Sequence, residues 1–267
     1  MLPTSEAIQY GEELQRSLDI GSTAEFFDII ESLKGDADLP DALLASIVDW
    51  SAVAQMYGES YAAEAKASLN LGGYIPNFSK DWIPQNWVHE VVRQGLNVER
   101  SEPFDMIDVG KIVATLSRRV LASFRATVSD FAVSDSTTVG FARKTNPGCC
   151  AFCALVSTRI YSSREAAGVV VGERQKMTVA TSSGRARRVK SGPYAGRARG
   201  RQGIGDKYHD HCKCTVVPVF EGSSDIVGEM SAMNGTSAIE AYYAARGDTN
   251  GSTKDVLAHM RKTLGAS

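Results

Sequence analysis

The sequence is poor in cysteine, with five among 267 residues, and it lacks any apolar run of about 18 residues that could cross a membrane. Its first residues, MLPTSEAIQYGEEL, have neither the basic segment nor the apolar core of a signal peptide. We therefore expect no membrane contact and synthesis in a cytosol. There, clustered cysteines more often bind a metal or act in catalysis than form disulfides.

Several motifs of enzymes and repeat proteins are also missing. No sequence period of 20 to 50 residues indicates a repeat architecture. The glycines do not follow the Rossmann or P-loop pattern, and the histidines are not arranged as H-x-E or H-E-x-x-H. These absences favour a protein that is not an enzyme.

Charge is distributed unevenly behind a net charge of −2. Residues 1–110 contain 6 Lys and Arg against 19 Asp and Glu, whereas residues 164–207 contain 11 against 3. An acidic front half and a basic segment of this kind indicate contact with a polyanion or acid–base docking between subunits.

Helices are expected over most of residues 1–135. The first candidate, residues 22–35, has Ser22 and Glu25 at capping-box spacing. The second is residues 39–73, with Pro40 in its first turn and an apolar stripe at three- and four-residue steps. Residues 74–84 are predicted as a linker.

Two further helical stretches follow this linker. Residues 84–96 predict a short helix, and residues 108–133 predict a long helix with one apolar face. Arg118, Arg119 and Arg125 lie off that face, so we expect them to be solvated.

The pattern changes after this helix. Residues 214–220, CTVVPVF, are rich in β-branched residues and predict a strand, while residues 182–205 are rich in Gly, Arg and Ser and predict an exposed loop. Weak helical patterns resume in residues 225–265. The predicted fold class is α+β: a mainly helical N-terminal half, a small zinc-stapled β region over residues 140–220, and a long basic loop.

The five cysteines form two clusters, Cys149-Cys150-x2-Cys153 and, 55 residues further on, His209-x2-Cys212-x-Cys214. Two thiolates from one segment and a thiolate and an imidazole from another match the tetrahedral ligand set of structural zinc. The predicted ligands are Cys150, Cys153, His209 and Cys212, with Cys214 and His211 as alternates. Cys149 is assigned to packing.

Three other interpretations of the clusters remain open. The cysteines could be reduced and packed as small hydrophobic residues without metal. A disulfide could join the two clusters. A cysteine nucleophile could use His209 or His211 as its base. The basic loop has two interpretations of its own, a solvated or subunit-docking segment or a phosphate-binding one. The candidate DNA-binding residues are Arg185, Arg187, Arg188, Lys190, Arg197, Arg199 and Arg201.

The stretch GFARKTNPGCCAFCALVSTRIYSS, together with YHDHCKCTVVPVF, resembles the zinc-motif region of the phage Mu F-like minor head proteins, especially the actinobacteriophage minor capsid branch. The resemblance covers roughly residues 110–220. This chain departs from the pattern where Thr158 separates Ser157 from Arg159, and its basic insertion over 164–207 is longer than usual.

The resemblance implies three parts: an acidic helical region (1–107), a Mu F-like domain (108–220) and a short helical tail (221–267). It implies a minor capsid protein of a tailed bacteriophage, present in low copy and assembled in the host cytoplasm. Inside the virion head it would act in head morphogenesis or in DNA packaging and ejection. Its implied partners are the portal, scaffold or major capsid protein and double-stranded DNA. A zinc-dependent nuclease, or another enzyme acting on nucleic acid, is the alternative from a different class.

Overall fold

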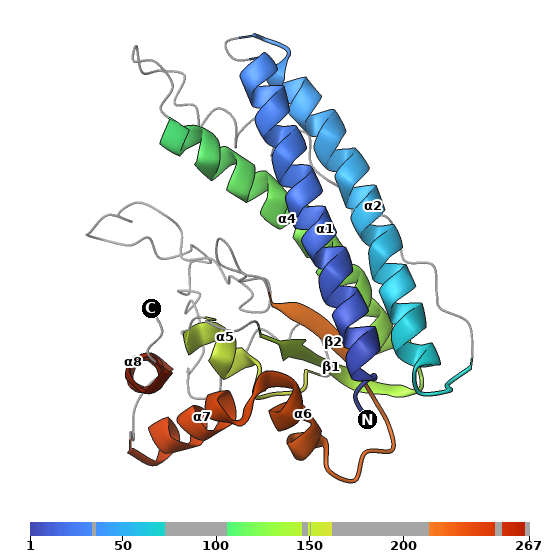
Figure 1. The fold of residues 1–267 in the computed structure, drawn as a ribbon, viewed down its shortest axis with the longest axis vertical. Helices are drawn as coiled ribbons and strands as arrows, with labels where there is room; N and C mark the ends of the chain where they lie inside the picture. The colour runs from blue at the N-terminus through green and yellow to red at the C-terminus, as the bar shows by residue number, and fades with distance from the viewer. Residues whose placement is uncertain are drawn as a thin grey trace, which may run out of the picture.

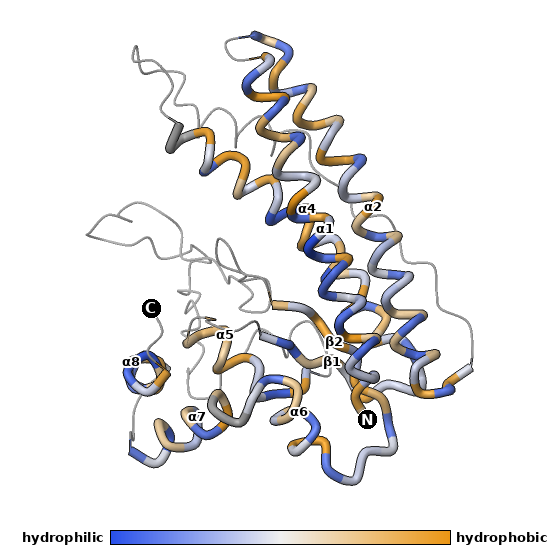
Figure 2. The backbone as a smooth tube through the Cα atoms, in the orientation of Figure 1, coloured by the Kyte–Doolittle hydropathy of each residue, from blue (hydrophilic) through white to orange (hydrophobic). Residues whose placement is uncertain are grey.

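Three long helices pack against one another in pairs and form the main body of the molecule in the computed structural model (Figure 1). They are α1 (Ser5–Ser32), α2 (Leu39–Ala67) and α4 (Met106–Ser134). Apolar and polar residues alternate along each with the repeat of an amphipathic helix (Figure 2). The structure describes residues 1–33, 36–72, 106–145, 149, 151–161, 214–248 and 253–264.

Helix α1 begins much earlier than the sequence predicted. Thr4 caps it by accepting a hydrogen bond from the amide of Ala7, and Ser22 is fully buried in its middle. The predicted start at Ser22 is therefore wrong. Glycine normally weakens a helix, but a Cβ atom on Gly21 would lie 2.4 Å from the ring of Trp50, so a larger residue there would force that ring to move.

Helix α2 begins where the sequence predicted, with Pro40 in its first turn, but it ends at Ala67. Asn70 adopts a left-handed backbone with φ of 56°, and the amide of Leu71 bonds back to the carbonyl of Lys66 at 3.2 Å. This turn satisfies a carbonyl at the helix end. The predicted linker (74–84) and short helix (84–96) lie outside the described residues.

Helix α4 supplies the centre of the core and agrees with its prediction. The residues of its apolar face are all buried: Ile112, Leu116, Val120, Phe124, Val128 and Phe131. They pack against buried residues of α1 and α2, among them Leu18 and Ile47. The burial of this stripe joins the three helices into one bundle.

Two strands, β1 (Thr138–Lys144) and β2 (Thr215–Phe220), form an antiparallel pair that packs on α4. Strand β2 confirms the prediction, and all six of its residues are buried. Tyr161 adds a bridge to β1, since it exchanges two backbone hydrogen bonds with Phe141, at 2.8 and 3.0 Å. The chain between residues 144 and 161 therefore leaves the sheet and returns to it.

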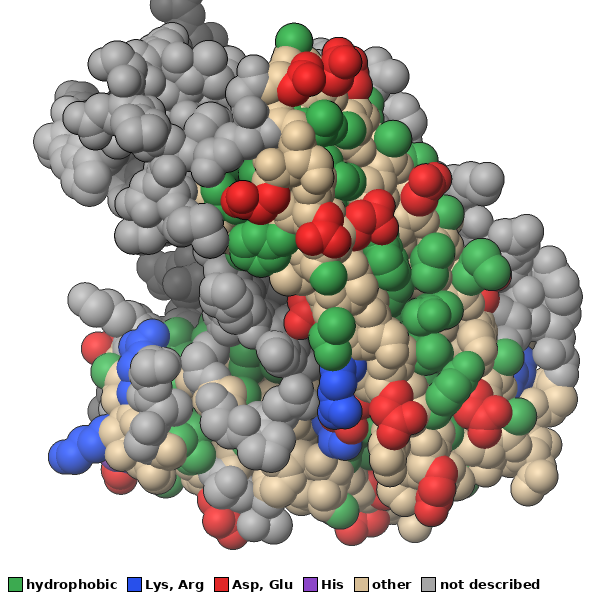
Figure 3. All heavy atoms as spheres, turned by 45° about the horizontal axis from the view of Figure 1, so that its top comes forward, with side chains coloured by type: hydrophobic (Ala, Val, Ile, Leu, Met, Phe, Trp, Pro, Cys, Tyr) green, Lys and Arg blue, Asp and Glu red, His purple; other side chains and the backbone are tan. Residues whose placement is uncertain are grey.

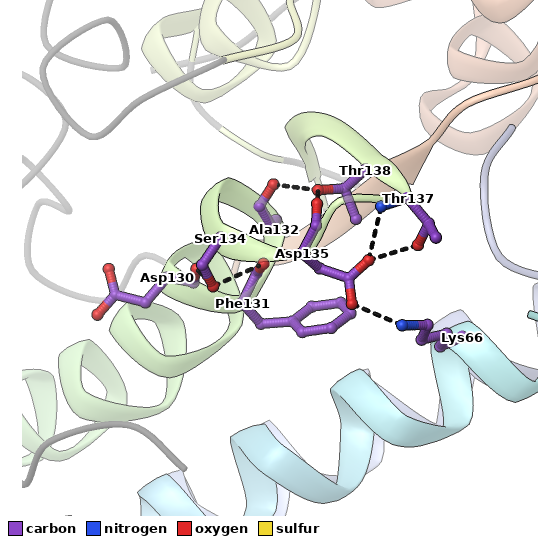
Figure 4. Close-up of polar contacts among 8 residues, drawn as sticks. All are labelled: Lys66, Asp130, Phe131, Ala132, Ser134, Asp135, Thr137 and Thr138. Carbon is purple, nitrogen blue, oxygen red and sulfur yellow. Dashed lines mark hydrogen bonds and ion pairs between the residues drawn. The ribbon is translucent and has the colours of Figure 1, made fainter. Parts of the chain in front are cut away.

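The turn between α4 and β1 is anchored to the end of α2 by an ion pair. Lys66 Nζ lies 2.6 Å from Asp135 Oδ2, and the other carboxylate oxygen accepts a hydrogen bond from the amide of Thr137 at 2.9 Å (Figure 4). Both charged side chains are buried. The pair thus fixes where the sheet begins relative to the bundle.

Four shorter helices complete the described part of the chain: α5 (Ala151–Val156), α6 (Ile226–Asn234), α7 (Thr236–Asp248) and α8 (Thr253–Leu264). Helices α7 and α8 pack against α5 and share a small apolar core with it, which includes Leu155, Ala245 and Met260. Mainly helical structure with one small sheet confirms the α+β class. None of the described helices is long and apolar enough to span a membrane.

Candidate metal centre

Cys153 and Cys214 lie together in the folded chain, although 60 residues separate them in the sequence. Cys153 belongs to α5 and Cys214 immediately precedes β2. Both are almost completely buried, with exposed fractions of 3% and 2%. The fold thus brings one member of each cysteine cluster to the same place.

Cys153 is held by the packing of α5. The helix places Ala154 and Leu155 in the apolar core shared with α7 and α8. At its end, the amide of Ser157 donates to the carbonyl of Cys153 at 3.0 Å, and Tyr161 then returns the chain to β1. Contacts on two sides therefore fix the position of this thiol.

Cys214 is held by α4. Its carbonyl oxygen accepts a hydrogen bond from Nε of Arg125 at 3.1 Å, and this arginine is only 2% exposed. The prediction that Arg125 is solvated is wrong, because strand β2 covers this side of α4. Arg118 and Arg119 are half-buried.

Cys149 is half-buried and packs against the Cys153–Cys214 pair. No disulfide joins these three cysteines. The other predicted ligands, Cys150, His209, His211 and Cys212, lie outside the described residues. Within the described part of the chain, no group of three or more His, Cys, Asp or Glu side chains is arranged to hold a metal.

The donors that the structure does bring together fit zinc chemically. Thiolates are preferred zinc ligands, and structural sites commonly take two ligands from each of two chain segments. Cys153 and Cys214 come from two such segments and meet in a buried place. Of the two cysteines that competed for the last position, the structure describes only Cys214, and it places that residue against Cys153.

Asn234, at the end of α6, is a positioning residue that sequence reasoning missed. Its side-chain amide donates to the carbonyl of Arg143 at 3.1 Å and, more weakly, to that of Ser157 at 3.4 Å. Its side-chain oxygen accepts from the amide of Thr145 at 2.8 Å. One side chain thus ties both ends of the segment that carries Cys149 and Cys153. Nothing in the sequence around Asn234 indicates this role.

A second contact that the sequence did not reveal links the chain after α5 to the C-terminal helices. The guanidinium of Arg159 lies over the ring of Tyr242, 5.6 Å from its centroid, and donates to its hydroxyl at 3.3 Å. The predicted DNA-binding arginines and lysine, between Arg185 and Arg201, all lie outside the described residues.

A family model described as VG15 protein matches residues 36–245, which is more than half of the chain. The match includes α2, α4, both strands and the cysteine pair, whereas α1 and α8 lie outside it. No curated protein and no solved structure has significant similarity to the chain. The chain therefore belongs to the VG15 protein family, a family of phage-type viral proteins.

Proposed function

We propose that this protein is a structural minor capsid protein of a tailed bacteriophage, present in low copy inside the head and close to the portal and the DNA. The observation that carries the proposal is the contact between Cys153 and Cys214. Membership of a phage-type family supports it, as does the resemblance of the two cysteine clusters to those of Mu F-like minor head proteins.

Cys153 and Cys214 flank the chain that contains the basic segment, so a metal bound to both would hold the two ends of that chain together. Tyr161 bridges to β1 and Cys214 directly precedes β2, so the part of the chain that contains the basic segment 164–207 leaves the sheet after Tyr161 and rejoins it at Cys214. A structural Zn²⁺ bound by Cys153 and Cys214, with further ligands from Cys150, His209, His211 or Cys212, would hold the base of that segment. Metal binding contributes folding free energy, which matters most where little apolar core is available.

The basic segment would then contact packaged double-stranded DNA. Its 11 Lys and Arg residues can neutralise phosphates without reading the base sequence, and such binding weakens steeply as salt rises. Arg185, Arg187 and Arg188 stand closest together in the sequence. Contact with the portal, scaffold or major capsid protein, and a role in head morphogenesis or in DNA packaging and ejection, belong to the same proposal.

The location is tested by mass spectrometry of purified virions and of empty heads from the phage that encodes the chain. We expect its peptides in both, at a small fraction of the major capsid protein. A phage that lacks the gene should give few DNA-filled heads. Absence of the protein from purified heads would refute the proposal.

The DNA contact is tested with the full chain and a variant that lacks residues 182–205. The deletion should weaken binding to duplex DNA and flatten its dependence on salt, because fewer counterions are released. Unchanged binding would assign the segment to docking between proteins. Zinc-dependent cleavage of DNA that requires Cys153 would replace the structural proposal with a nuclease.

A further inference from the structure

The two helices α1 and α2 lie side by side, and their outer seam carries a row of large apolar side chains. Tyr10 and Leu14 of α1 and Trp50, Val53 and Tyr57 of α2 are half-buried. They recur at three-, four- and seven-residue steps, so those of each helix share one face. We call this row, together with the neighbouring Met56, the α1–α2 seam.

Polar contacts across the two helices keep the seam on the outside of the bundle. The hydroxyl of Tyr10 lies 2.9 Å from that of Ser60 near one end, and the indole of Trp50 donates to Glu25 at 2.9 Å further along. Helix α4 packs on the other side, where Thr127 contacts Gly58. Within the described part of the chain, the seam therefore lies on the side of the α1–α2 pair that faces away from α4.

The apolar side chains of the seam resemble the centre of a protein interface. Met56 is 65% exposed, so it extends the apolar row into solvent. Tyr, Trp and Met are enriched at the buried centres of interfaces, whereas charged residues are found at the rim. Figure 3 shows hydrophobic side chains gathered over the α1–α2 pair with acidic side chains among and around them.

The charged residues around the seam are almost all acidic. Helices α1 and α2 contain 11 Asp and Glu residues but only two basic ones, Arg16 and Lys66. Lys66 is buried and paired with Asp135, so it adds no charge to this surface. Glu25, which accepts a hydrogen bond from Trp50, is exposed, and the other exposed acidic residues of the two helices include Glu6, Glu13, Asp28, Asp49 and Glu64.

The acidic charge around the seam limits which molecules can bind to it. A second copy of the chain would bring two acidic faces together, and DNA would meet the same repulsion, so neither complements the surface. The basic stretch 182–205 of the chain would match the charge but would leave the apolar row uncovered, because it is poor in apolar residues. None of these three matches both features, whereas an occupant with both a basic and an apolar side matches the whole face.

From the apolar row and its acidic rim we infer that the α1–α2 seam binds an amphipathic, basic helix of another protein. The apolar side of that helix lies over Trp50, Val53 and Met56, and its Lys and Arg residues meet the acidic rim. In this mode of recognition an amphipathic helix lays its apolar face on a complementary apolar surface, here one formed by two adjacent helices. The inference does not rest on the proposed capsid role, since it uses neither the cysteine pair nor the basic segment.

The experiment uses the full chain and a labelled peptide of about 20 residues, built from Leu and Lys so that it forms a helix with one apolar face. Fluorescence anisotropy should show binding that weakens at high salt, because the rim contributes through screened charges. A peptide with Glu in place of Lys, and one of the same composition but scrambled order, should bind at least about tenfold more weakly. Equal binding of either control peptide would overturn the inference.

Two double variants, each of which replaces one apolar and one acidic residue by Lys, test whether the peptide binds at the seam. Met56→Lys with Asp49→Lys should weaken binding of the Leu–Lys peptide by about tenfold or more. The matched control, Val227→Lys with Glu240→Lys, replaces an exposed apolar and an exposed acidic residue elsewhere and should bind as the wild type does. Equal weakening in both variants would show that only overall charge matters and would overturn the assignment.

Two further measurements test the competing occupants. A wild-type dimer in sedimentation that the Met56→Lys/Asp49→Lys variant abolishes would assign the seam to a second copy. Deletion of residues 182–205 that strengthens peptide binding by about tenfold would show that the chain's own basic stretch occupies the seam. Either result would replace a partner helix as the occupant, and we expect neither.

Discussion

Lys66 and Asp135 form a buried ion pair that joins the end of α2 to the start of the sheet. The two charged atoms are 2.6 Å apart, and the side chains are only 6% and 5% exposed. Asp135 also accepts hydrogen bonds from the amide and the hydroxyl of Thr137 (Figure 4). Because each charge has partners, the pair is stable where either charge alone would not be.

Replacing Lys66 by Met should lower the free energy of unfolding by roughly 3 kcal/mol, because the carboxylate of Asp135 would remain buried without its counter-charge. Urea denaturation followed by circular dichroism measures this change. The control is Lys144→Met, which breaks an ion pair of the same 2.6 Å length to Glu12 that is about a fifth exposed. Lys144→Met should lower the free energy of unfolding by at most about 1 kcal/mol. Equal losses would show that burial does not set the strength of the pair.

The same pair predicts an acid-sensitive contribution to stability. Burial alone would raise the pKa of Asp135, but the hydrogen bonds from Lys66 and Thr137 and the charge of Lys66 outweigh it, so the pKa lies below its usual value. A carboxyl group with a lowered pKa stabilises the fold fully above its unfolded pKa of about 4 and loses this as pH falls through the folded pKa. The difference in unfolding free energy between wild type and Asp135→Asn should therefore be constant near neutrality and shrink below about pH 4. A difference that is independent of pH would contradict the assignment.

The sequence predicted those elements whose own pattern is strong. The apolar stripe from Ile112 to Phe131 identified α4, and the β-branched run 214–220 identified β2. It failed where a contact from elsewhere in the chain overrides the local signal. The glycines in α1 resemble helix breakers, but the rings of Tyr61 and Trp50 occupy the space that side chains there would need.

The candidate site was predictable only in part for the same reason. Ligand-type residues in two clusters indicated that Cys153 and one of Cys212 and Cys214 would meet. Nothing local indicated that Arg125 is buried against Cys214 or that Asn234 ties the segment around α5, because both depend on contacts with residues far away in the chain. Such contacts follow from the packing of the elements and not from any local pattern.

Gly58 should not tolerate alanine, although alanine is the better helix former. A Cβ atom there would lie 2.8 Å from Cβ of Thr127 and 3.1 Å from the carbonyl oxygen of Phe124, so α2 and α4 would have to move apart. Gly58→Ala should destabilise the protein by roughly 1 to 3 kcal/mol in thermal or urea denaturation. The control is Gly110→Ala in α4, where a Cβ atom meets nothing within 4 Å and should stabilise by up to about 1 kcal/mol. A stabilising Gly58→Ala would refute the close approach of the two helices.

Tyr61 carries a buried hydroxyl group. The side chain is fully buried, its ring stacks on Phe124 at 6.1 Å, and the hydroxyl has no hydrogen-bond partner among the described residues. Burial also raises the pKa of Tyr61 well above its usual value. Tyr61→Phe should therefore leave the free energy of unfolding unchanged or raise it by about 1 kcal/mol, since it removes a desolvated polar group.

Tyr161→Phe is the matched comparison. The hydroxyl of Tyr161 donates to the carbonyl of Val156 at 2.7 Å in a buried place. Its removal should cost about 1 kcal/mol or more, because that carbonyl loses its donor. If Tyr61→Phe destabilised the protein as much as Tyr161→Phe, an internal partner for the Tyr61 hydroxyl would have to exist.

The cysteine pair makes the sharpest prediction for the candidate metal centre. Protein purified under reducing conditions should contain about one equivalent of zinc, because thiolates from both clusters are needed to complete a tetrahedral site. Cys153→Ser and Cys214→Ser should each lose most of this zinc, and a chelator should lower the thermal midpoint of the wild type. The readout is metal analysis combined with thermal denaturation.

The Cys149→Ser variant tests whether Cys149 binds zinc or only packs against the cysteines that do. Cys149 packs against the pair but directly precedes Cys150, which is one residue too close for both to enter one tetrahedron easily. The variant should keep its zinc, and its thermal midpoint should fall much less than those of Cys153→Ser and Cys214→Ser. Loss of zinc from Cys149→Ser would make Cys149 a ligand in place of Cys150. Less than about half an equivalent in the wild type would instead mean that the cysteines pack as small apolar side chains, as buried thiols do elsewhere.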